Sequence, residues 1–268
     1  MNLLRSLWGG SPGHWGRGAW HWLAGWWRIV DFGSQMLVLA LSPSSYRQSQ
    51  RRVMYREFYA ATGPLLPTFV VIASVLSLVI IRIVVATAES YGLSRYALDV
   101  LVRTLVLELL PLTVALFVAL RYTMPGAEVV AAMRAQGTLH AMWRSGRDPA
   151  RDELLPRVLA GVFAVALLAS LGCLLALLLT YLTVYGFTTW AFDDYTRTVG
   201  QVFNPAVTLI FAFKALFLSL TVAIVPVAPE QLRRGAVRQN KRDNIGLLGR
   251  VFALILLGEV LSLVGNYY

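Results

Sequence analysis

The chain alternates between long apolar segments and short segments rich in arginine. A helix of about twenty apolar residues, rising 1.5 Å per residue, spans the roughly 30 Å hydrocarbon core of a bilayer. Apolar segments of about this length occur at 65–88, 100–120, 158–181, 204–226 and 247–264. The pattern predicts an all-α integral membrane protein with five transmembrane helices.

The amino-terminal region has a different pattern. Between residues 15 and 41, apolar side chains fall on one broad face of a helix, whereas polar side chains such as Arg28 and Asp31 gather on the opposite face. Tryptophan favours the headgroup level of a membrane. We therefore expect an amphipathic helix that lies in the interface, anchored by Trp20, Trp22, Trp26 and Trp27. A full span is the alternative interpretation, and it would place the charged residues in hydrocarbon.

The distribution of arginine predicts the orientation in the membrane. Basic residues concentrate in the segments 46–56, 121–157 and 229–246. Because cytoplasmic loops carry an excess of Lys and Arg, these segments are expected inside the cell, with the amino terminus inside and the carboxyl terminus outside. This gives a cytoplasmic and interfacial region, 1–63, and a five-span domain, 64–268, whose cytoplasmic segment is 122–157.

The composition supports a membrane protein. The chain has 268 residues, of which 57% are hydrophobic and 14% are charged, against about 25% charged residues in soluble domains. Its formal net charge of +10 is of the kind that nucleic-acid-binding proteins carry. The positive charge of cytoplasmic loops explains it better, so we expect no nucleic-acid partner.

Four ionisable residues fall inside the predicted spans, namely Arg82, Glu108, Lys214 and Glu259. Such residues are costly in hydrocarbon and usually face other helices or a water-filled cavity. Pro111 follows Glu108 closely and predicts a kink beside the acid. The four groups indicate either a shared polar pathway or buried ion pairs that hold the bundle together. Glu108 alone would fit a side chain that reaches the interface, and Arg82 either reaches the outer interface or pairs with Glu108.

The sequence carries no pattern typical of an active site. It lacks the Gly-x-x-x-x-Gly-Lys-Ser/Thr phosphate loop and the Gly-x-Ser-x-Gly nucleophile motif. The histidines, at positions 14, 21 and 140, are not at metal-ligand spacing. We therefore expect no catalytic residue, no metal site and no cofactor bound by this chain.

The second predicted span resembles that of the MlaE/YrbE family, the permease subunits of bacterial ABC transporters that move phospholipids or other lipids with an MCE-domain partner. The family has an Arg-Glu-Leu-Gly-Pro motif in this span. Glu108 and Pro111 match it, whereas Leu107 and Leu110 replace its arginine and glycine. The resemblance covers about residues 50 to 268.

Other family positions follow in order. Arg121 matches an arginine after the proline, Met133 and Arg134 match a Met-Arg pair, and Glu128 is displaced by one position from a family acid. Lys214, Phe217 and Glu259 match residues of the last two spans, while Arg82 stands where family members have glutamine. By this resemblance the intramembrane lipid-pathway residues are Arg82, Glu108, Pro111, Lys214 and Glu259, and the residues that couple to an ATPase are Arg121, Glu128, Met133, Arg134 and Gln136.

The resemblance implies a multi-pass protein of the bacterial inner membrane that works as a dimer with a second copy or a paralogue. Two copies would enclose a lipid cavity. This cavity would open toward the periplasm, where the MCE-domain protein would lie. The segment 126–142 would act as a coupling helix on a cytoplasmic ABC ATPase, which would bind the ATP and magnesium.

Two other functions are compatible with the residues. The replaced motif positions fit a scaffold subunit that assembles the ATPase and the MCE protein without moving lipid itself. Glu108 taken alone fits an ion-coupled secondary transporter or a channel, although five unequal spans do not offer the inverted halves common in such transporters. The sequence specifies neither the lipid nor the direction of its movement.

Overall fold

A computed structural model of the chain describes residues 12–46, 48–188, 190–228 and 241–267. These described residues form helices and turns and no strand. The helices are α1 (Pro12–Leu41), η1 (Pro43–Tyr46), α2 (Gln48–Thr62), α3 (Leu65–Ser90), α4 (Ser94–Leu101), η2 (Val102–Leu109), α5 (Leu110–Val118), η3 (Ala119–Thr123), α6 (Met124–Ala135), α7 (Thr138–Arg144), η4 (Ala150–Leu154), α8 (Leu155–Tyr185), α9 (Phe192–Val202), α10 (Pro205–Ile224) and α12 (Lys241–Tyr267). Of these, η1 is a 3₁₀-helix, and η2, η3 and η4 are π-helical.

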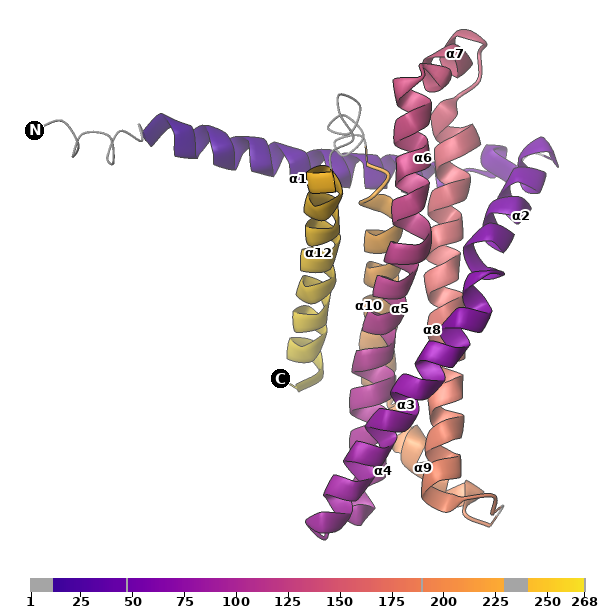
Figure 1. Ribbon diagram of the computed structural model, residues 1–268, viewed down its shortest axis with the longest axis vertical. Helices are drawn as coiled ribbons and strands as arrows, with labels where there is room; N and C mark the ends of the chain where they lie inside the picture. Colours follow the sequence, from indigo (N-terminus) through magenta and orange to yellow (C-terminus); the bar gives the residue numbers. More distant parts are fainter. Residues whose placement is uncertain (1–11, 47, 189, 229–240, 268) are drawn as a thin grey trace, which may run out of the picture.

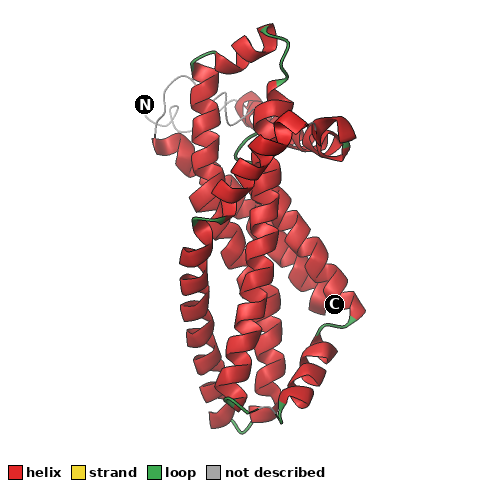
Figure 2. Cartoon of the chain, turned by 90° about the vertical axis from the view of Figure 1, so that its right-hand side faces the viewer, coloured by secondary structure: helices red, strands yellow, loops and turns green. Residues whose placement is uncertain are grey.

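The five predicted spans are present as helices. The segments long and apolar enough to cross a membrane are Gln50–Ser90, Tyr96–Ala135, Ala150–Tyr185, Pro205–Ile224 and Gly246–Gly265. The long helices run side by side along the longest axis of the molecule (Figure 1), and short connections join most of them (Figure 2). The first three are much longer than predicted, because helical structure continues through the polar sequence at their ends.

Helix α8 lies at the centre of the bundle and contacts α2, α3, α5 and α10. Small residues make this close packing possible. A Cβ atom on Gly161 would lie 3.2 Å from both the Ala223 Cβ and the Thr123 Cγ2, and one on Gly172 would lie 3.2 Å from the Phe69 Cζ. Glycine at these two positions therefore sets how near the neighbouring helices approach α8.

Helix α1 runs across the ends of the spans, roughly perpendicular to them (Figure 1). It contacts α8 and α10 through a buried face made of Ile29, Phe32 and Met36. We predicted a single apolar face for this helix, directed at the lipid and carrying the tryptophans. The described part of α1 instead has an apolar face packed on the bundle and a second apolar face, including Trp27, that is exposed.

The predicted anchors differ in what the structure describes. Trp26 is half-buried and packs against the hydrophobic core, whereas 76% of Trp27 is exposed. The backbones of Trp20 and Trp22 are part of α1, but their side chains are outside the described part of the structure.

The end of the bundle opposite α6 and α7 is closed by α4 and α9, which lie next to each other (Figure 1). Tyr195 of α9 is buried, and its hydroxyl donates a hydrogen bond to the Leu177 carbonyl at 2.8 Å. Burial, and next the neighbouring Tyr185, raise the pKa of Tyr195 to about 12. The phenol therefore stays protonated and keeps donating to α8 at any physiological pH.

Candidate functional site

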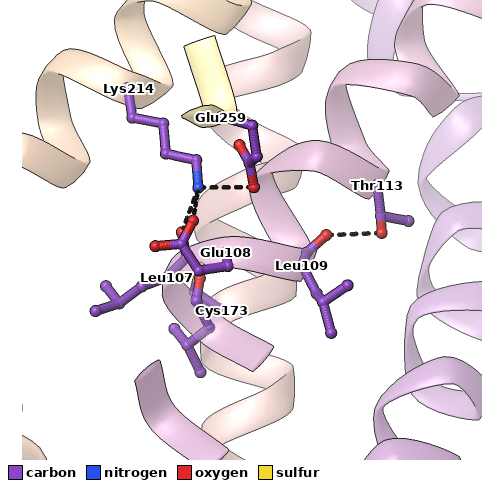
Figure 3. A network of polar contacts seen from close by, with 8 residues as sticks. Leu107, Glu108, Leu109, Thr113, Cys173, Lys214 and Glu259 are labelled. Carbon is purple, nitrogen blue, oxygen red and sulfur yellow. Dashed lines mark hydrogen bonds and ion pairs between the residues drawn. The ribbon is translucent and has the colours of Figure 1, made fainter. Parts of the chain in front are cut away.

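Lys214 of α10 lies between two carboxylates that come from different helices (Figure 3). Its Nζ forms an ion pair with Glu108 of η2 and stands 2.9 Å from the Oε1 of Glu259 on α12. The same Nζ donates to the backbone carbonyl of Leu107 at 3.0 Å. All three hydrogens of the ammonium group thus have acceptors. Three of the four ionisable residues predicted inside the spans meet in this cluster, which we call the lysine triad (Glu108, Lys214 and Glu259).

The backbone next to Glu108 is prepared for this contact by Pro111. Proline has no backbone N–H, so the carbonyl of Leu107, four residues earlier, does not receive the hydrogen bond of an ordinary α-helix. The helix is π-helical from Val102 to Leu109 and returns to α-helix at Leu110. Short π-helical segments within α-helices are frequent at functional sites. The kink predicted from Pro111 is therefore a local change of helix type that leaves an acceptor for Lys214.

The lysine triad sits where two hydrophobic clusters meet. Val106, Leu107 and Leu110 belong to one cluster, and Leu218 and Ile255 belong to the other. The Lys214 side chain is 1% exposed, and those of Glu108 and Glu259 are 14% and 13% exposed. Removal from water is costly for each charge, so the triad is stable only while its members stay paired.

The lysine triad has more carboxyl groups than ammonium groups. One ammonium faces two carboxyl groups, and the Glu259 Oε2 is buried without a hydrogen-bond partner among the described residues. The nearby Cys173 thiol donates to the Val106 carbonyl at 3.7 Å. Within the described part of the chain, no group of three or more His, Cys, Asp or Glu residues is arranged to hold a metal ion. The triad can therefore hold helices together and receive one further hydrogen-bond donor.

Arg82 does not join the lysine triad. Its side chain is exposed on α3, and the basic partner of Glu108 is Lys214. Of the two positions expected for Arg82, pairing with Glu108 is therefore wrong. An exposed guanidinium on a long stem is instead placed to reach a membrane interface.

The predicted coupling segment consists of two helices. α6 continues directly from η3, and α7 begins after Gly137, whose φ of 74° suits glycine. The single helix expected over 126–142 is therefore wrong, because the chain turns at Gly137. Of the predicted coupling residues, Met133 is half-buried and the others are exposed, namely Arg121, Glu128, Arg134 and Gln136.

Sequence reasoning missed the polar contacts of Asp152 at this end of the bundle, one of which joins distant segments. Gln50 of α2 donates to the Asp152 Oδ1 at 2.9 Å, and Arg147 donates to the Asp152 Oδ2 at 2.9 Å. Spacing gives no signal for such contacts. The Leu107 carbonyl was missed as well, although a proline four residues later is a signal that could have indicated it.

The fold and the lysine triad define the class of the protein: a multi-pass helical membrane protein with a buried ion cluster between its spans. Residues 54–229 match the family model described as Permease MlaE. This match covers more than half of the chain, so the chain belongs to the MlaE permease family, as the motif around Glu108 had indicated. Membership implies a transmembrane, non-catalytic subunit of an ABC transporter for lipids. A comparison with curated proteins gave no match.

Proposed function

We propose that this chain is the permease subunit of an ABC transporter that moves phospholipid or another lipid between the bacterial inner membrane and a periplasmic MCE-domain partner. The observation that carries this proposal is the MlaE family match over residues 54–229. The five apolar helices and the lysine triad inside them support it.

The proposed orientation places α6 and α7 in the cytoplasm and α4 and α9 in the periplasm. Two observations support this assignment. The described arginine-rich segments 48–56 and 121–157 belong to the end of the bundle that carries α6, as the bias of cytoplasmic loops requires. α1 crosses the spans at that same end (Figure 1), where an in-plane amphipathic helix meets the headgroups.

In this proposal a second permease, a copy or a paralogue, completes a lipid cavity open toward the periplasm. A cytoplasmic ATPase, which binds the ATP and magnesium, docks on α6 and α7. The coupling residues are then Arg121, Glu128, Met133, Arg134 and Gln136. Because α6 continues from the second span without a loop, a displacement of α6 moves that span directly.

The lysine triad has a mechanical role in the proposed cycle. Lys214 joins η2, α10 and α12 through a single ammonium group. Any movement that separates two of these helices must therefore break a buried ion pair or hand the lysine to another acceptor. Because an unpaired buried charge is costly, arrangements in which Lys214 has an acceptor are favoured, which favours a switch between two paired states over a gradual deformation.

A scaffold subunit that does not transport lipid is the second candidate function. Leu110 at the glycine position of the family motif is the observation that favours it. Leu110 is fully buried, and its Cδ2 would lie 3.6 Å from a Cβ built on Gly172. The larger residue on one helix is accommodated by glycine on the other, so the scaffold hypothesis rests on the replaced motif position itself and not on a disturbed bundle.

Reconstitution tests the proposal. The chain is co-expressed with the ATPase and MCE-domain proteins of its own operon, purified, and assayed in liposomes for ATP hydrolysis and lipid transfer. We expect the proteins to co-purify, and we expect Met133→Ala and Arg134→Ala to lower the ATPase rate. A complex that does not assemble, or an ion current without the ATPase, contradicts the proposal. Glu108→Ala and Lys214→Ala variants that assemble and transfer lipid normally support the scaffold.

A further inference from the structure

A pocket of about 220 Å³ opens at the end of the bundle that carries α6. It is distinct from the lysine triad, and it lies where four helical segments meet. α2, the end of the second span with α6, α8, and the end of α10 supply its lining, which consists of Glu57, Tyr122, Thr123, Gly126, Val129, Arg157, Ala223 and Val227. The pocket therefore combines one acid, one base and a phenol with an apolar wall.

The acid and the base of the pocket belong to different helices and have different partners. Glu57 accepts a hydrogen bond from the Tyr122 hydroxyl at 3.3 Å, and the exposed Arg56 reaches it only at 3.8 Å. Arg157 donates to Glu153 at 3.2 Å and to the Gly126 carbonyl at 3.5 Å, the longer of which is a weak contact. Glu57 and Arg157 are therefore not paired with each other.

Arg157 has donor capacity left over. Its side chain is only 15% exposed, and its Nε is buried and has no hydrogen-bond partner among the described residues. A buried N–H of a charged group without an acceptor is costly. The weak 3.5 Å contact of Nη1 leaves the guanidinium, which lines the pocket, able to donate to an anion there, and its fork suits phosphate oxygens in particular.

The pocket lies at the level expected for lipid headgroups. Tyr122, Arg157 and Ala223 stand at or near the ends of three predicted spans. α1 crosses the bundle beside them, since a Cβ atom on Gly33 would lie 3.5 Å from the Cδ1 of Ile224, the neighbour of Ala223. Val129, Ala223 and Val227 offer an apolar wall to the part of a lipid below its headgroup.

We infer that this pocket binds the zwitterionic headgroup of a phospholipid from the leaflet on the α6 side. The phosphate lies against Arg157, and the ammonium lies against Glu57 and the ring of Tyr122, which attracts a cation to its face. This site is additional to the proposed transport cavity, which opens at the other end of the bundle. It links α2, the second span, α8 and α10, so a bound lipid stabilises the end of the bundle that is proposed to receive the ATPase.

Native mass spectrometry of the purified chain in detergent tests this inference without any transport partner, so its outcome is separate from that of the proposed function. The chain is titrated with phosphatidylethanolamine and, in parallel, with phosphatidylglycerol. We expect a specific phosphatidylethanolamine adduct that Arg157→Gln and Glu57→Gln each weaken about tenfold, as the loss of one charge-assisted hydrogen bond predicts. Glu57→Gln is also expected to abolish the preference over phosphatidylglycerol.

Gly126→Leu keeps the test decisive if a charge variant does not fold. A Cβ on Gly126 meets no atom within 4 Å, so leucine fits there, fills the pocket and favours the helix. The matched control is Gly200→Leu on α9, where a Cβ also meets nothing within 4 Å. We expect the adduct to disappear in the first variant and to persist in the second.

Three results overturn the inference. One is equal phosphatidylethanolamine binding in the original chain and in Gly126→Leu. Another is phosphatidylglycerol binding that equals or exceeds that of phosphatidylethanolamine in the original chain. The third is binding of free phosphoethanolamine without binding of the lipid, which assigns the pocket to a water-soluble zwitterion.

Discussion

The Lys214 ammonium donates to the carbonyl of Leu107 at 3.0 Å, an acceptor that Pro111 leaves without its α-helical donor. The contact joins a local effect of the sequence to long-range packing, since the two residues are 107 positions apart. Glu108, the next residue, pairs with the same ammonium. Pro111 and Lys214 therefore act together, because Pro111 removes the helical donor of the Leu107 carbonyl and Lys214 donates to that carbonyl instead.

Lys214→Met tests the lysine triad as a support of the fold. The substitution keeps a long side chain but leaves two buried carboxyl groups without their counter-charge. Breaking a buried ion pair from one side costs about 3–5 kcal/mol. We expect a loss of this size in the free energy of unfolding, measured by denaturant titration in detergent micelles.

The matched control is Arg82→Met, which removes a cation from the exposed surface of α3 and is expected to change stability by less than about 0.5 kcal/mol. The triple variant Glu108→Met, Lys214→Met and Glu259→Met replaces the whole triad with apolar groups. It should recover most of the lost stability. A triple variant as unstable as Lys214→Met would show that the charges are not the cause.

Pro111→Ala separates stability from function. Alanine restores a backbone N–H that competes with Lys214 for the Leu107 carbonyl, and it favours the helix by up to about 3 kcal/mol. We expect an unchanged or higher melting temperature together with a decrease in lipid transfer of up to about tenfold, the equivalent of one hydrogen bond. A lower melting temperature with normal transfer would contradict the assigned role of the proline.

Gly161→Leu tests the close packing around α8. Because a Cβ atom there already lies 3.2 Å from Ala223 and from Thr123, a larger side chain must push α10 and η3 away. Overpacking of this kind costs about 1–3 kcal/mol, which thermal unfolding in detergent would detect. Gly249→Leu on α12 is the control, since a Cβ there meets nothing within 4 Å. Equal effects of the two substitutions would exclude the packing explanation.

Cysteine labelling tests the position of α1. In a Cys173→Ala background, Gln35→Cys and Leu37→Cys place thiols on two exposed positions of the same helix. The polar face that carries Gln35 is expected to face the cytoplasm, while Leu37 faces the acyl chains. A membrane-impermeant maleimide added to inside-out vesicles should therefore label Gln35→Cys and spare Leu37→Cys. Protection of both thiols would favour a helix that spans the membrane.

Much of the fold was predictable because a bilayer imposes strong rules on sequence. The apolar segments specified five spans, and the cost of buried charge singled out Glu108, Lys214 and Glu259. Their meeting was open, since periodicity along one helix contains no information about which helices are neighbours. Arg82 shows the difference: it satisfied the same rule by sequence, yet it is exposed on α3.

Helix ends were harder to predict than spans. The second span was expected to stop near Leu120, where polar residues begin, but helix continues to Ala135. Polar residues end a transmembrane segment without ending a helix. The pocket beside Glu57 and Arg157 was invisible for a related reason, because its residues come from four segments that only the packing of α8 brings together.

The uninterrupted helix from Tyr96 to Ala135 has 40 residues, which at 1.5 Å per residue gives a length of about 60 Å, roughly twice the hydrocarbon thickness. In the proposed orientation such a rod would act as a lever with its fulcrum at the membrane surface. A sideways displacement of α6, at one end of the rod, would then move the other end, at α4, in the opposite direction. The π-helical stretches η2 and η3 are the two places along this rod where the regular α-helix changes, and therefore where its axis can change direction.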